Sequence, residues 1–121
     1  MEKIQVSAPK QFLFLLNQLF EIEQKVGKLN EQHSIQRNID RIKNYFETEA
    51  FPGGQGLVYH NPIGENYNET RSDCEASISG SGHENLEIIE VLKPIIYAKY
   101  GDSQMIVQKA IVIVQSNKLN E

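Results

Sequence analysis

The chain has 121 residues, of which 40% are hydrophobic and 23% are charged. These fractions are typical of a globular protein and exclude wholesale disorder. The formal net charge is −4, with 12 basic residues spread among 16 acidic ones, and this argues against a nucleic-acid partner because phosphate contacts require clustered Lys and Arg. The length suffices for one modest domain plus an extended helical element.

Three features predict a cytoplasmic protein with no membrane association. The one cysteine, Cys74, cannot form an internal disulfide, which fits a reducing compartment. Residues 1–5 lack the basic start and apolar core of a signal peptide. The apolar run from Phe12 to Leu16 is interrupted by Asn17 too early to form a membrane span.

The stretch from Pro9 to about Ala50 is amphipathic and predicts a long helix. Ser7 and Pro9 make a suitable start, because a serine hydroxyl can accept an orphan backbone N–H and proline is tolerated in the first turn. Apolar residues then recur in steps of four and three, with a one-residue slip, at the spacing that faces a partner helix in a coiled coil. They are Leu15, Leu19, Ile22, Val26 and Leu29, followed by Ile35, Ile39, Ile42 and Phe46.

A continuous helix of this length would extend roughly 60 Å at about 1.5 Å per residue. The remainder of the chain is too small to cover such a helix, so we expect a second copy of the chain to do so. The expected dimerisation residues are Leu15, Leu19, Ile22, Val26, Leu29, Ile39 and Ile42. The alternative is two shorter helices that fold back within one monomer, with a break between Asn30 and Ser34, where the residues are poor helix formers and Ser34 is suited to cap a new helix.

The segment from Phe51 to Gly56 ends the helical region. Pro52 cannot continue a helix, and three glycines in four positions provide the unusual dihedrals of a joint. The segment matches no phosphate-binding loop, because no Lys-Ser/Thr pair follows it. We therefore expect a helical dimerisation region over residues 1–52 and a glycine-rich hinge over residues 53–56.

Beyond the hinge, residues 57–116 predict a small β domain, followed by a polar tail over residues 117–121. We expect strands over residues 57–60, 75–79, 86–97 and 105–114, with a loop over 61–72 and a turn over 100–103. Pro94 would confine its strand to a sheet edge or produce a bulge, whereas the last strand is apolar on both faces, as a central strand is. The predicted fold class is α+β, with a long N-terminal coiled-coil helix followed by a mostly antiparallel β domain.

Five short segments follow one another between Gly56 and Val114. They are Gly56-Leu57-Val58, Gly64-Glu65-Asn66-Tyr67-Asn68, Glu75-Ala76, Val91-Leu92-Lys93-Pro94 and Gln108-Lys109-Ala110-Ile111-Val112-Ile113-Val114. In order and spacing they resemble the GrpE-type nucleotide exchange factors of the DnaK chaperone system. The chain departs from that family's pattern at Cys74, where the family has His, at Pro94, where it has Gly, and at Met105 and Gln108, where it often has Arg.

The resemblance implies a non-enzymatic homodimer that needs no cofactor. It implies that the β domain binds a DnaK-type ATPase domain and holds its nucleotide cleft open, so that ADP leaves faster. Contacts would involve exposed aromatic, methionine and cationic side chains, which are common anchors of protein interfaces. The candidates for partner binding are Tyr67, Arg71, Lys93, Tyr97, Met105 and Lys109.

Two other functions are compatible with the sequence. A coiled-coil adaptor or scaffold of a bacterial or phage assembly would share the helix but would have no effect on nucleotide exchange. An enzyme would use Cys74 with His60, His83 and Asp73, because a nucleophilic cysteine needs a base and an orienting group. We favour a small, partly buried thiol at Cys74, and the same residues lack the paired spacing of metal ligands, so we expect neither a catalytic nor a metal site.

Overall fold

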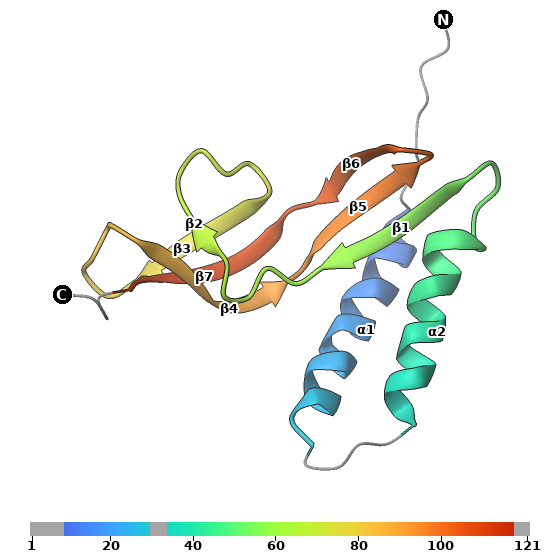
Figure 1. Ribbon diagram of the computed structural model, residues 1–121, viewed down its shortest axis with the longest axis horizontal. Coiled ribbons are helices and arrows are strands. Elements are labelled where there is room, and N and C mark those ends of the chain that lie inside the picture. Colours follow the sequence, from blue (N-terminus) through green and yellow to red (C-terminus); the bar gives the residue numbers. More distant parts are fainter. Residues whose placement is uncertain (1–8, 30–33, 118–121) are drawn as a thin grey trace, which may run out of the picture. The chain divides into compact units, whose positions relative to one another are not determined.

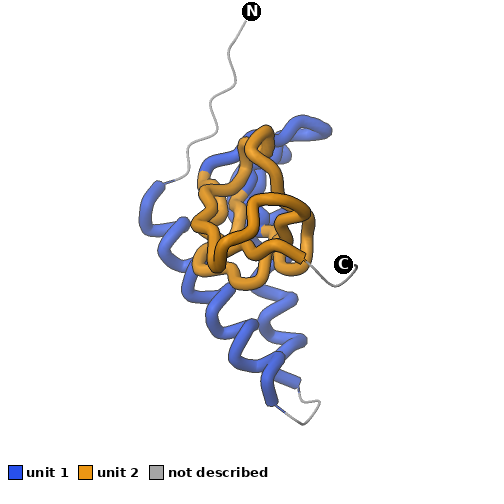
Figure 2. The backbone as a smooth tube through the Cα atoms, turned by 90° about the vertical axis from the view of Figure 1, so that its left-hand side faces the viewer, with its two compact units in different colours: residues 1–59, 97–107 blue, residues 60–96, 108–121 orange. Residues whose placement is uncertain are grey.

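The computed structural model describes residues 9–29 and 34–117, and these residues form two helices and seven strands (Figure 1). The chain divides into two compact units, which Figure 2 colours separately. Unit 1 comprises residues 1–59 and 97–107, and unit 2 comprises residues 60–96 and 108–121. Strand order defines two sheets, one of three strands and one of four.

Two separate helices replace the single long coiled-coil helix that the sequence predicts, so the predicted fold class is wrong on this point. Helix α1 spans Lys10–Gly27 and helix α2 spans Ile35–Thr48, and each is too short to be a long coiled-coil helix. The N–H groups of Lys28 and Leu29 bond back to carbonyls three residues earlier, which closes α1. Gly27 explains the position of this end, because glycine has a low helix propensity.

The helix starts agree only in part with the expected caps. Ser34 is the N-cap residue of α2, but its hydroxyl makes no capping bond; its carbonyl instead accepts the N–H groups of Arg37 and Asn38. Pro9 is the N-cap residue of α1. The cap predicted at Ser7, the break predicted over residues 30–33 and the polar tail beyond Asn117 lie outside the described residues.

Packing within one chain uses part of the heptad stripe. The two helices contact each other, and Phe12 lies edge-on to Phe46 and Phe51, with ring centroids 6.1 and 5.3 Å apart. The buried helical side chains are Leu16, Leu19, Phe20, Ile39 and Phe46. Leu15, Ile22, Leu29 and Ile42, by contrast, remain between 45% and 55% exposed. The periodic stripe is thus divided between a covered part and an open part.

The sheet of unit 1 has the order β1-β5-β6, from strands Gln55–His60, Ile95–Tyr100 and Ser103–Gln108. Both helices contact it. The Phe20 ring of α1 lies 5.8 Å from the Tyr59 ring of β1, and the Lys99 ammonium of β5 lies 2.8 Å from the Glu47 carboxylate of α2. The helical hairpin is therefore attached to the sheet by apolar and charged contacts together.

Glu23 connects three elements of unit 1. Its carboxylate accepts a bond of 2.7 Å from the Tyr59 hydroxyl and one of 3.0 Å from Gln36 Nε2, and it lies 3.3 Å from the Lys43 ammonium. Burial alone raises the pKa of Glu23, but the bonds from these partners outweigh it and lower that pKa. Burial, followed by the bond to Glu23, raises the pKa of Tyr59. A neutral phenol therefore donates to an ionised carboxylate, and this joins α1 and α2 to β1.

The sheet of unit 2 has the order β2-β4-β7-β3. Its strands are β2 (Asn66–Tyr67), β3 (Cys74–Ser79), β4 (Leu86–Lys93) and β7 (Ala110–Ser116). Strand β7 pairs antiparallel with β4 and parallel with β3, so the expected central position of the C-terminal strand is confirmed. Only one of its two apolar faces is buried, because Ile111 on the other face is 37% exposed. Alternate residues of the sheet form one buried face, made of Cys74, Leu86, Ile88, Val91, Ala110, Val112 and Val114.

Two of the predicted strands are each divided into two. Pro94 separates β4 from β5, because it has no backbone N–H to give to a ladder; its carbonyl accepts a bond of 3.0 Å from Gln108 Nε2. Lys109 separates β6 from β7. The bulge expected at Pro94 is replaced by two register shifts inside β4, between Ile88 and Glu90 and between Val91 and Lys93. The segment predicted to be a loop also contains the short strand β2.

Gly56 provides the first test of this packing, because it lies directly against the end of α2. A Cβ atom at this position would lie 2.0 Å from the backbone oxygen of Glu47, closer than any real contact. We expect Gly56→Ala to lower the free energy of unfolding by about 1–3 kcal/mol, as overpacking usually does. Gly27→Ala is the matched control, since a Cβ there meets nothing within 4 Å, and it should be neutral or slightly stabilising. Urea denaturation of both variants measures the difference, and equal stabilities would contradict the packing described.

Candidate functional site

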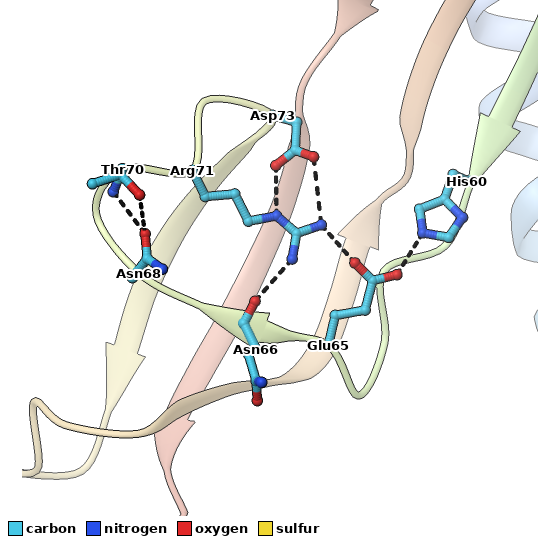
Figure 3. Close-up of polar contacts among 7 residues, drawn as sticks. All are labelled: His60, Glu65, Asn66, Asn68, Thr70, Arg71 and Asp73. Atoms are coloured by element: carbon cyan, nitrogen blue, oxygen red, sulfur yellow. Dashed lines mark hydrogen bonds and ion pairs between the residues drawn. The ribbon is translucent and has the colours of Figure 1, made fainter.

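The largest cluster of polar contacts in unit 2 surrounds Arg71 (Figure 3). Its guanidinium lies 2.6 Å from Asp73 Oδ1 and 2.6 Å from Glu65 Oε1, and it donates a bond of 2.9 Å to the backbone oxygen of Asn66. The second oxygen of Glu65 bonds His60 Nε2. The N–H groups of Arg71 thus donate to acceptors of its own loop, and these bonds stabilise the conformation of that loop.

Local backbone bonds explain why this loop folds as it does. The side-chain oxygen of Asn68 accepts the backbone N–H of Thr70 at 2.9 Å and also the Thr70 hydroxyl, which is the Asx-turn that Asn favours. The ends of the loop are tied to the sheet, because the Glu65 carbonyl accepts the N–H of Ile88 and the Asp73 carbonyl accepts that of Ala110. Arg71 is therefore held between two fixed points.

The pKa values of the cluster follow from burial and ion pairing. Burial alone raises the pKa of Glu65, but the bonds from Arg71 and His60 lower it overall. Burial likewise raises the pKa of Asp73, and the bonds from Arg71 and Cys74 outweigh that effect. The bond to Asp73 is the main cause that raises the pKa of Arg71. Both carboxylates are ionised at neutral pH, so neither is suited to act as a general acid.

Cys74 is the small buried thiol that the sequence predicts. It is 6% exposed, and burial, with a smaller contribution from the bond to Asp73, raises its pKa to about 11. A thiol with so high a pKa is a poor nucleophile at neutral pH. Among the described residues no hydrogen bond joins Cys74 to a histidine. His60 bonds Glu65 instead, and His83 lines a pocket of the unit. The arrangement does not support a cysteine nucleophile.

A pocket of about 500 Å³ opens beside the same loop. This volume lies within the range of known ligand pockets, about 300–1,000 Å³. Its lining combines aliphatic side chains of the buried sheet face with polar side chains of the surrounding loops. The residues are Tyr67, Asn68, Glu69, Ala76, Ile78, His83, Asn85 and Leu86, all within unit 2. The pocket is the main concave feature that we consider for binding.

The six residues proposed for partner binding fall into two sets. Tyr67, Arg71, Lys93 and Lys109 belong to unit 2, whereas Tyr97 and Met105 belong to unit 1. Tyr67 lines the pocket. Lys93 and Lys109 are both exposed, and Lys93 pairs with Ile111, which is two residues beyond Lys109 on the neighbouring strand. Met105 is 51% exposed on strand β6, next to β5, which carries the half-buried Tyr97. Arg71, in contrast, is turned into its own loop.

The sequence analysis placed Asp73 in a possible catalytic set and Glu65 in a family-like segment, but it did not predict that both would pair with Arg71, and it did not identify Glu69 and Asn85 as pocket residues. Glu65 precedes Arg71 by six positions and Asp73 follows it by two. This alternation of charges within one short loop was the sequence signal that could have predicted the cluster. Glu69 and Asn85 gave no such signal, because their meeting at the pocket depends on how β2, β3 and β4 are ordered in the sheet. Asn85 has a φ of +52°, a conformation that Asn tolerates better than most residues.

The chain matches no protein-family model, no curated protein and no solved structure. The resemblance to GrpE-type factors therefore rests on the residues of this chain alone. Within residues 9–29 and 34–117, no helix is long and apolar enough to cross a membrane. Over the same residues, no group of three His, Cys, Asp or Glu side chains is arranged to hold a metal ion.

The Arg71 cluster gives a second test. We expect Arg71→Met to lower the free energy of unfolding at pH 7 by about 1–2 kcal/mol, between the values typical of exposed and of buried ion pairs, since the pairs are partly shielded from water. Arg37→Met, on the exposed surface of α2, is the matched control and should change stability by less than about 0.5 kcal/mol.

The effect of Arg71→Met should depend on pH. The pKa values of Glu65 and Asp73 are lowered in the folded state, so their contribution to stability is present above the unfolded pKa values, about 4, and is lost as the pH falls through the folded values. The stability difference between the parent and the variant should therefore narrow below about pH 4. Urea titrations from pH 7 to pH 3 measure it, and a difference that stays constant would rule out the charge-based explanation.

Proposed function

We propose that the protein is a non-enzymatic nucleotide exchange factor that binds a DnaK-type ATPase domain and accelerates the release of ADP. One observation supports this proposal most directly. Four of the five segments that resemble the GrpE-type factors, although separated by loops, belong to one four-stranded sheet, and three of these four pair with one another. Glu75 and Ala76 pair with Ile111 and Val112, and Val112 pairs in turn with Val91.

The fourth segment, residues 64–68, joins the same sheet through a part of β4 that lies outside the resembling segments. The Gly64 N–H bonds the Ile88 carbonyl, and Asn66 and Tyr67 pair with Glu87 and Leu86. Four short segments that are separated in the sequence are thus brought together in a single sheet. The segments therefore make up one structural unit, as parts of a single binding module would.

An exchange factor of this kind needs no catalytic group. It binds better to the open state of the ATPase domain, which holds nucleotide poorly, and this difference in affinity shifts the ATPase domain toward release. The chain fits such a role, because Cys74 is a poor nucleophile and the Arg71 cluster is satisfied internally. What it offers instead is exposed apolar and cationic side chains. They are Met105, Ile106 and Tyr100 at the β5–β6 hairpin and Lys93 and Lys109 in unit 2.

We also propose that the chain is a homodimer, through a face that differs from a long coiled coil. Leu15, Ile22 and Leu29 follow one another at seven-residue intervals, as do Ile35 and Ile42, and all are 45–55% exposed. Phe20, which faces the sheet, lies five positions after Leu15, about 140° away round the helix. The exposed stripe therefore lies on the side of the hairpin turned away from the sheet.

The second helix presents its stripe on the same side. Glu47, which contacts Lys99 of the sheet, lies five positions after Ile42, again about 140° away. Two adjacent stripes of apolar side chains thus form one outer face of the hairpin. Two helices about 9 Å apart, each about 10 Å wide and up to roughly 27 Å long, give this face roughly 500 Å² in projection, and its accessible area is larger. A standard interface needs about 800 Å² per partner, so a second copy of the hairpin is a suitable occupant.

The exchange activity is tested by the release of fluorescent ADP from a DnaK-type ATPase domain, with and without the protein. We expect an acceleration of roughly 5- to 150-fold at saturation, the usual range of coupling between two sites. Met105→Glu and Lys109→Glu should each reduce the effect by weakening the contact. Ile63→Glu is the control, because Ile63 is 49% exposed but lies outside the proposed contact residues. No acceleration by the unaltered protein would reject the proposal and favour the adaptor or scaffold alternative.

The dimer is tested by sedimentation equilibrium, which should give twice the mass of a single chain. The double variant Ile22→Gln/Ile42→Gln should sediment as a monomer, because it places four additional amides in the paired apolar face. Lys28→Gln/Arg41→Gln changes exposed positions outside the stripe and should leave the dimer intact. Circular dichroism checks that both variants fold. A single-chain mass for the unaltered protein at every concentration would refute the interface.

A further inference from the structure

The pocket of unit 2 combines an aliphatic floor with a negatively charged rim. Ala76 and Ile78 of β3 and Leu86 of β4 form the floor, and Ile78 is still 44% exposed there. Tyr67, which carries an aromatic ring, and Glu69, which carries a carboxylate, line the same space. An aliphatic surface next to an aromatic face and a carboxylate matches the two parts of a long cationic side chain, which has an apolar stem and a charged head.

The charges around the pocket favour a cation over other ligands. Glu69 brings one negative charge, and none of the lining residues is Lys or Arg. Arg71, only two positions further along the chain, does not neutralise it, because the Arg71 guanidinium is held by Asp73, Glu65 and the Asn66 carbonyl (Figure 3). No ion pair joins Glu69 to another side chain within the described part of the chain. The net charge of the whole chain, −4, adds to the same attraction.

We infer that this pocket receives the side chain of an arginine or lysine that a partner protein presents. The guanidinium or ammonium would pair with Glu69 and lie against the Tyr67 ring, and the methylene stem would cover Ile78 and Leu86. An open pocket with one carboxylate binds a free small cation only weakly, since exposed ion pairs contribute little. A cation carried on a protein surface gains affinity from the surrounding contacts, and this favours a protein partner. The inference does not depend on nucleotide exchange activity.

The test uses a probe that carries this side chain alone, N-acetyl-arginine amide, titrated into the whole ¹⁵N-labelled protein. We expect saturable shifts of the Glu69, Ile78 and Leu86 amides that weaken as the salt concentration rises. N-acetyl-citrulline amide has nearly the same shape without the charge, and it should bind more weakly. Equal binding of the two probes would overturn the role of charge.

Two variants locate the interaction. Glu69→Gln should weaken the probe roughly threefold to fivefold, the effect of losing one exposed ion pair. Glu75→Gln makes the same change on the opposite face of β3 and should leave binding unchanged. Because Glu69 is exposed, its variant is expected to fold, and its amide spectrum shows whether it does. Shifts that arise elsewhere on the surface, an unaffected Glu69→Gln variant, or the absence of any saturable shift would each overturn the inference, whereas a failed exchange assay would not.

Discussion

The architecture depends on a backbone constraint at Pro94. A proline has no N–H to give to a sheet ladder, so the strand that begins at Leu86 cannot continue in its own sheet beyond Lys93. The chain enters the other sheet at Ile95, and after the hairpin it returns through Lys109 to the first sheet. The Gln108 amide donates to the Pro94 carbonyl, so the two crossing points are bonded to each other. Two stretches of sequence thereby supply strands to both sheets.

The constraint at Pro94 also marks the limit of what could be predicted about the sheets from the sequence. The β-strands after residue 55, the turn near Gly101 and the central position of the last strand follow from composition and alternation, which act locally. The division at Pro94 was only partly predictable, since a proline is compatible with an edge, a bulge or a break. The choice depended on where the next strand found a partner, and strand order is not a local property.

The helical region shows the same limit in a different form. Apolar residues at intervals of three and four positions are the signature of a helix with a covered stripe, and that part of the prediction follows from the sequence. The same intervals occur in a long coiled coil and in a helical hairpin. Low helix propensity near Gly27 decided between them, and Phe20, Tyr59 and Glu23 then attached the hairpin to a sheet that the helical sequence does not reveal. Leu19 and Ile39 were consequently covered within the chain, and Leu15 and Ile22 were not.

The candidate site was the least predictable part, because it depends on which charges are already satisfied. The sequence predicts that Arg71 and Glu69 are both exposed charged residues of one polar loop. In the fold the two charges differ, since Arg71 pairs with Asp73 and Glu65, whereas Glu69 lines an open pocket and forms no ion pair within the described residues. A charge that is paired internally contributes mainly to the shape of its loop, whereas an unpaired charge beside an aliphatic surface attracts a partner. The same reasoning applies to Cys74, whose burial beside ionised Asp73 suppresses its reactivity. The paired charges of unit 2 therefore hold its loop in place, whereas Glu69 is left for the partner cation proposed above.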